Sequence, residues 1–170
     1  MSKLDLRWIS VSDTFPALSV GSVIALDRSS LHLTSLQRVS SIAIGSILIG
    51  LLVTAATLRP SQHGFGTHQQ LGLPPCTIQL LYSVRCPACG MTTSWAHATR
   101  GQLFAALRAN VGGTLLAGLA IIVGPWLLLS GFRGRWIWWV PNEWIAAAVS
   151  LALLLVTIMD WGCRLLAGWR

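Results

Sequence analysis

Three of the four cysteines lie close together in the sequence. Cys76 precedes a short apolar run, and Cys86 and Cys89 follow it within "CPACG" at 86–90. Thiolates attack disulfides, oxidise to disulfides and bind soft metal ions. The three-residue spacing brings both sulfurs of the pair within reach of each other or of one ion. The segment therefore allows three states: a dithiol, a disulfide or a metal thiolate.

The residues around the pair predict the start of a helix. Proline is favoured at the first helical position, so we expect Cys86 at the N-cap, Pro87 at N1 and Cys89 at N3. The unpaired N–H groups of a first helical turn lower the pKa of a thiol, and Arg85 adds a positive neighbour. If the pair is redox-active, Cys86 is the nucleophile, Cys89 the resolving thiol and Cys76 a third member.

A zinc site would need a fourth ligand, because structural zinc takes four ligands in sets such as Cys₃His. His63 and His68 lie in the Gly- and Pro-rich loop before the cysteines and can reach them. His97 is about 12 Å beyond the pair along a helix and is too far to share an ion. One Cys-x-x-Cys pair plus a third cysteine is weaker evidence than two such pairs, so structural thiols or a structural disulfide stay open as alternatives. The candidate metal ligands are Cys76, Cys86, Cys89 and His68.

The elements that must position these cysteines have the composition of membrane helices. Hydrophobic residues make up 54% of the 170 residues and charged residues only 10%, whereas globular proteins carry about 25% charged residues. The net charge of +7 comes from arginines scattered at the ends of apolar runs. We therefore expect the lipid bilayer as their partner, and no nucleic acid, because no basic cluster is present.

Three apolar stretches are long enough to cross the hydrocarbon core. Arg38 and Arg59 bracket the first, and Pro60 ends it. Within it, Ser41 and Gly45 have the four-residue spacing that lets a second helix approach closely. The expected spans are about 39–58, 112–131 and 144–163, in a membrane domain 38–170 that follows a poorly ordered or interfacial N-terminal arm, 1–37.

The segment 71–111 lies between the first two spans and carries the cysteines. We expect a short helix after the pair, a break at Gly101, and a second helix from near Gln102 that runs without interruption into the second span. The predicted fold class is an all-α integral membrane protein with about three transmembrane helices plus a short interfacial or re-entrant helical hairpin. This hairpin carries the Cys-Pro-x-Cys-Gly motif.

Arginine and lysine counts do not orient the chain in the membrane. Three spans place six basic residues on each side of the membrane, so the positive-inside rule favours neither orientation. The side matters for the chemistry, because thiols outside the cytoplasm tend to oxidise while those inside stay reduced or hold metal.

The cysteine segment resembles a family of small bacterial membrane proteins known only as domain of unknown function twenty-seven fifty-two. The resemblance covers about 71–116 and implies a multi-spanning protein of the bacterial cell membrane, with no established activity. The matching residues are Cys76, Cys86, Pro87, Cys89, Gly90, Thr92, Gly101, Ala106 and Asn110. Pro87, Gly90, Thr92, Gly101 and Asn110 are the candidate structural residues.

The chain departs from that family pattern at three positions. Thr93 replaces the usual Arg, Gln102 the usual Asp and Val111 the usual Pro. If the family's Arg pairs with a thiolate or an anionic substrate, that role is lost here or passes to Arg85 or Arg100.

Four other residues draw attention. We expect Asn110 to hydrogen-bond the cysteine turn, since an unpaired buried amide is costly. Asp160 and Arg164 have the spacing of an ion pair on one helix, and Cys163 is expected to be a small core thiol.

Two functional hypotheses from different classes follow. In the first, the cysteine turn is a structural clasp, held by thiols, a disulfide or zinc, that shapes a surface facing lipid, a membrane protein partner or a second copy of the chain. In the second, the chain is a membrane thiol-redox protein that uses the Cys86/Cys89 pair. A subunit of an oligomeric transporter or channel is a weaker third alternative, and the sequence does not decide whether the protein is an enzyme.

Overall fold

The computed structural model describes residues 32–138 and 140–166, and the helices of this part lie in the compact unit Leu33–Arg170. The predicted all-α fold is confirmed, because the described residues form helices and connecting loops. Most of the expected N-terminal arm, 1–37, lies outside the described residues. Three helices are long and apolar enough to cross a membrane: α2 (Ser35–Thr57), α6 (Val111–Arg133) and α7 (Glu143–Leu166).

Each long helix extends beyond the apolar stretch that predicted it. Helix α2 begins at Ser35 rather than near 39. Thr34 and Gln37 form a capping box that starts the helix before the charge-free stretch that follows Arg38. Arg38 therefore lies inside the helix, and its Nε donates to the carbonyl of Gly131 on α6 at 3.1 Å. The apolar run marks the part suited to lipid, whereas the caps set the ends of the helix.

Between α2 and α6 the chain forms four short helices. The hairpin expected from the sequence is present, but its second helix does not continue into α6. Asn110 is extended, with φ −166° and ψ 116°, and its side chain caps α6 by accepting from the amide of Gly113. The capping side chain starts a new helix where we expected a continuous one. The short helices are η2 (Thr67–Leu71, a 3₁₀ helix), α3 (Thr77–Tyr82), α4 (Met91–Ala98) and α5 (Leu103–Ala109).

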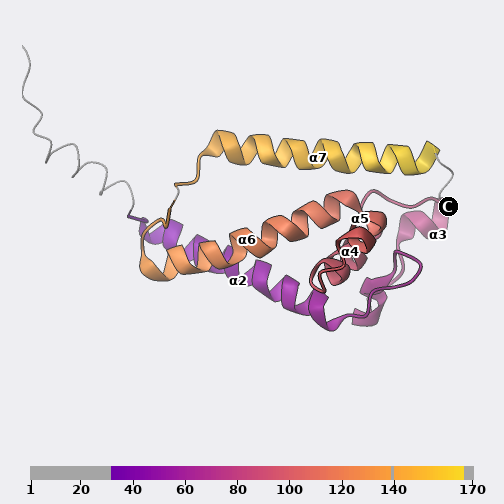
Figure 1. The fold of residues 1–170 in the computed structure, drawn as a ribbon, viewed down its shortest axis with the longest axis horizontal. Helices are drawn as coiled ribbons and strands as arrows, with labels where there is room; N and C mark the ends of the chain where they lie inside the picture. The colour runs from indigo at the N-terminus through magenta and orange to yellow at the C-terminus, as the bar shows by residue number, and fades with distance from the viewer. Residues whose placement is uncertain (1–31, 139, 167–170) are drawn as a thin grey trace, which may run out of the picture. The chain divides into compact units, whose positions relative to one another are not determined.

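Helix α6 packs against both α2 and α7, and α4 and α5 lie beside its first turns (Figure 1). Small residues allow the α2–α6 contact, since a Cβ added to Gly45 would lie 3.0 Å from the carbonyl oxygen of Gly124. Ser41 is also buried on this face. The small-residue spacing in the first span therefore marks the face that packs on α6.

The hydrophobic core is small and lies where α4 meets α2 and α6. Trp95 and Ala98 of α4 pack with Leu52 and Ala55 of α2 and with Ala117 of α6. Helix α7 contributes no buried residue. The expectation of a core thiol at Cys163 is wrong, because α6 is the only described helix against which α7 packs, and this side chain is exposed.

Candidate functional site: a three-cysteine cluster

The Cys-Pro-Ala-Cys sequence forms a tight turn and not the first turn of a helix. The amide of Cys89 donates to the carbonyl of Cys86 at 3.0 Å, and the amide of Met91 donates to that of Ala88 at 3.1 Å. Gly90 then takes a left-handed conformation, φ 86°, and α4 begins only at Met91. The predicted N-cap role of Cys86 is therefore wrong, because the left-handed glycine separates the pair from the helix.

The turn brings the three clustered cysteines together. The sulfurs of Cys76, Cys86 and Cys89 all lie within 4.8 Å of one another, and the Cys86 and Cys89 sulfurs are 3.2 Å apart. All three side chains are half-buried free thiols. They line a cavity of about 270 Å³, together with His68, Thr92 and Thr93 among other residues. The sequence pattern thus identified residues that the fold assembles into one site.

His68 faces this cavity with a defined ring orientation. Its Nε2 lies 3.2 Å from the carbonyl oxygen of Pro74. A carbonyl can only accept, so Nε2 carries the proton and Nδ1 is the nitrogen with a free lone pair. Histidines that bind metals donate their other ring N–H to a partner of this kind. In the neutral ring this contact leaves Nδ1 able to bind a metal, although His68 is not one of the residues whose ligand atoms lie within 4.8 Å of one another.

Cys76, and not the Cys86/Cys89 pair, occupies the helix start. It is the N-cap of α3, although its sulfur makes no capping hydrogen bond. The nearby backbone amides of Gln79 and Ile78 lower the pKa of its thiol. Burial, followed by the neighbouring sulfur of Cys86, raises the pKa of Cys89 to about 12. The pKa of Cys76 is thus lowered at a helix start, whereas that of Cys89, where we expected a lowered value, is raised.

Asn110 fastens the turn to the second spanning helix. Its Nδ2 donates to the carbonyls of Pro87 at 3.0 Å and Cys89 at 3.1 Å, while its Oδ1 accepts from the amide of Gly113 at 2.7 Å. The side chain is 1% exposed. The hydrogen bond expected between Asn110 and the turn is present, and it is made twice.

Gly90 closes the turn against two other segments. A Cβ at this position would lie 2.4 Å from the carbonyl oxygen of Ala109 and 2.7 Å from that of Gly64. Both are backbone atoms and cannot rotate away. Glycine is required here because there is no room for a Cβ and because the backbone has a positive φ.

The end of α7 supports the turn from the other side. The indole N–H of Trp161 donates to the carbonyl of Arg85 at 2.8 Å. The expected ion pair between Asp160 and Arg164 is present, and Arg164 also donates to the carbonyl of Ala109 at 2.8 Å. The last turns of α7 thereby join the cysteine turn and the α5–α6 junction.

Residues 76–124 match DUF2752, a protein family of unknown function. The DUF2752 match includes the three clustered cysteines, the turn, α4, α5 and the first half of α6. It confirms the resemblance that the sequence indicated. Neither a curated protein nor a solved structure matches the chain.

The positions that depart from the DUF2752 pattern have local roles here. Thr93 is fully buried and its hydroxyl is 2.8 Å from that of Thr67. Gln102 accepts from the His97 ring at 2.7 Å. Arg100 donates to the carbonyls of Ala96, Ala56 and Leu58, so it joins the ends of α2 and α4 and does not replace the missing arginine beside the thiols.

Sequence analysis missed three supports of the site. Thr67 pairs with Thr93, Phe65 lies under the guanidinium of Arg85 at 4.5 Å, and Trp161 reaches back from the far end of the chain. None of the three belongs to a local motif. A buried threonine pair and a contact across 76 residues depend on the tertiary fold, which spacing along the chain does not reveal.

Proposed function

We propose that the chain is a membrane protein in which Cys76, Cys86, Cys89 and His68 bind a structural zinc ion. The clasp fixes the surface formed by η2 and α3 on the loop side of the spanning helices. The observation that carries the proposal is the convergence of three free thiols on one cavity that His68 also lines.

The sulfur spacing supports zinc over an incidental cluster. Zinc–sulfur bonds of about 2.3 Å in a tetrahedron place sulfurs about 3.8 Å apart. The three sulfurs lie within 4.8 Å of one another, with one pair at 3.2 Å, so small side-chain rotations reach that spacing. Zinc favours thiolate over thiol, and it would supply the positive charge that offsets the burial of Cys89.

A zinc clasp would fix the position of α3, a helix that makes few other tertiary contacts. Helix α3 has no buried residue and packs against no other helix in the described part of the chain. Its N-cap is Cys76, one of the three clustered cysteines. Binding of one ion by Cys76, His68 and the Cys86/Cys89 turn would tie α3 and η2 to the turn, and Asn110 ties the turn to α6.

The surface held in this way is apolar. Leu80, Leu81 and Tyr82 of α3 are each about 70% exposed, and Leu71 and Leu73 before it are about half exposed. Exposed apolar residues beside spanning helices favour contact with the lipid interface or with another membrane protein, including a second copy of the chain. On the strength of the family resemblance, we propose that the membrane in question is a bacterial cell membrane.

A thiol-redox role for the pair is the second candidate, and one observation favours it. The sulfurs of Cys86 and Cys89 are in contact at 3.2 Å, and both are free thiols. In that role the two thiols would lose two protons and two electrons to an oxidised partner thiol pair and close a disulfide. The third cysteine and the oriented histidine favour zinc.

Metal analysis of the purified protein separates the two candidates. The chain is purified in detergent without chelator, and zinc and free thiols are counted before and after mild reduction. We expect about one zinc per chain, which is lost in Cys86→Ser and His68→Ala. Cys163→Ser and His63→Ala are matched controls that should keep it, since neither residue lines the cavity. A metal-free protein whose Cys86–Cys89 disulfide forms and reduces readily would support the redox role instead.

A further inference from the structure

A second cavity, of about 420 Å³, lies beside the cysteine site and shares no lining residue with it. Its polar lining comes from three segments: the loop after α2, the residue before the cysteine pair, and helices α4 and α5. The polar residues that line it are Ser61, Gln62, His63, Arg85, His97 and Arg108. The size is in the range of small-molecule sites.

The cavity carries positive charge that no acid compensates. Two arginines line it and no Asp or Glu does. In the described part of the chain the only acids are Asp160, which pairs with Arg164, and Glu143, at the far end of α7 about 25 Å along the helix from Asp160. Arg85 and Arg108 therefore have no ion-pair partner among the described residues.

Arg85, the less exposed of the two arginines, is held in place but has no ion-pair partner among the described residues. The Arg85 guanidinium stacks over Phe65, and its backbone carbonyl accepts from Trp161. Its Nε is buried and has no hydrogen-bond partner. A buried guanidinium N–H without an acceptor is costly, and an anion in the cavity would supply the acceptor.

The remaining lining residues supply further hydrogen-bond donors. The Ser61 hydroxyl accepts from the amide of His63 at 3.3 Å, which leaves its own hydrogen to donate. Arg108, in the last turn of α5, is exposed, and its side chain makes no hydrogen bond with the described residues. Two guanidinium groups and a hydroxyl match the several acceptor oxygens of a phosphate group.

We propose that this cavity binds a phosphate group, with Arg85 and Arg108 as its charged ligands. The cavity lies at the ends of the spanning helices, where phospholipid headgroups lie, so the phosphate could belong to an anionic lipid or to a soluble anion. The inference is independent of the zinc clasp, because the two cavities have no residue in common.

Calorimetric titration of the purified protein in an uncharged maltoside detergent tests the site with two probes. One arm uses inorganic phosphate, and the other uses dihexanoyl phosphatidic acid at the same concentrations. We expect saturable binding of at least one probe, weakened about tenfold or more in Arg108→Gln through loss of charge-assisted hydrogen bonds. The tighter probe identifies the source of the phosphate.

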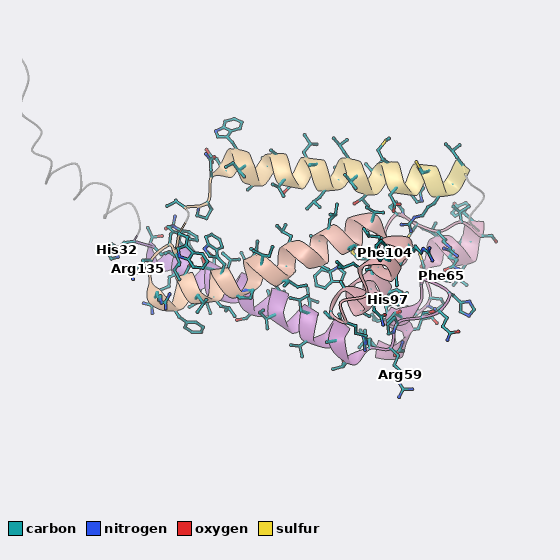
Figure 2. All side chains as sticks on the ribbon, viewed as in Figure 1. His32, Arg59, Phe65, His97, Phe104 and Arg135 are labelled. Carbon is teal, nitrogen blue, oxygen red and sulfur yellow. The ribbon has the colours of Figure 1, made fainter. Side chains whose placement is uncertain are left out.

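Arg59→Gln is the matched control. Arg59 lies on the same loop, does not line the cavity, and its side chain projects away from the hairpin (Figure 2). The Arg59→Gln variant should bind both probes as tightly as the unaltered protein does. Unaltered zinc content and melting temperature in Arg108→Gln will show that the fold and the clasp are intact. The proposal is overturned if neither probe saturates, or if Arg108→Gln binds as tightly as Arg59→Gln.

Discussion

The side-chain amide of Asn110 donates to the backbone carbonyl of Cys89 at 3.1 Å, and the same residue caps the second spanning helix. One buried side chain therefore connects the cysteine turn to the start of α6. Its second donor bond, to the carbonyl of Pro87, fixes the turn from both of its ends. The position of the cluster relative to the membrane spans depends on this contact.

Replacement of Asn110 by Ala should destabilise the protein by about 2–4 kcal/mol. The change removes an N-cap and leaves two partly buried carbonyls without the Asn110 donor. The measurement is the apparent melting temperature in detergent together with zinc content. Asn142→Ala is the control, because Asn142 makes an exposed bond to the amide of Trp144, and its loss should cost about 1 kcal/mol or less. Equal effects of the two substitutions would contradict the role of Asn110.

Replacement of Gly90 by Ala should disrupt the turn. The new Cβ would collide with the carbonyls of Ala109 and Gly64, in addition to the roughly 1–2 kcal/mol cost of a left-handed non-glycine residue. Gly101→Ala carries the same backbone cost, since φ is 72°, but meets nothing within 4 Å. We expect zinc loss and a large fall in melting temperature for Gly90→Ala only. A variant that keeps its zinc would show that the turn is not closely packed.

In the metal-free protein, alkylation should distinguish Cys76 from Cys89. The pKa of Cys76 lies below its ordinary value of 9.0, and that of Cys89 lies at about 12. Because only the thiolate reacts, at pH 8 Cys76 should be labelled by iodoacetamide well before Cys89. The Cys89 rate should rise about tenfold per pH unit up to about pH 11. Peptide mass spectrometry after timed labelling measures both rates, and equal rates at pH 8 would refute the assignment.

The membrane spans could be predicted because their signal is contained in local composition. Stretches of about 20 apolar residues indicate α2, α6 and α7 directly. Their ends could not be predicted in this way, because Thr34 and Asn110 set two of them by capping. A polar residue directly before an apolar run, such as Asn110, is compatible with either a helix start or a continuous helix.

The cysteine cluster was predictable in its membership but not in its geometry. The three-residue spacing of Cys86 and Cys89 predicts that their sulfurs lie close together. The nearness of Cys76 in the sequence predicts that it joins them. The left-handed conformation of Gly90 is fixed by backbone atoms of Gly64 and Ala109, which are distant in sequence. For this reason the pair was assigned to a helix start that belongs to Cys76 instead.

X-ray absorption at the zinc edge tests the zinc clasp most directly, because it reports the atoms bound to the metal. The purified protein should show three sulfur neighbours at about 2.3 Å and one nitrogen neighbour at about 2.0–2.1 Å. His68→Ala should lose the nitrogen shell or the metal, while Cys163→Ser leaves the spectrum unchanged. A protein that binds no zinc, or whose zinc has only nitrogen and oxygen neighbours, would contradict the account.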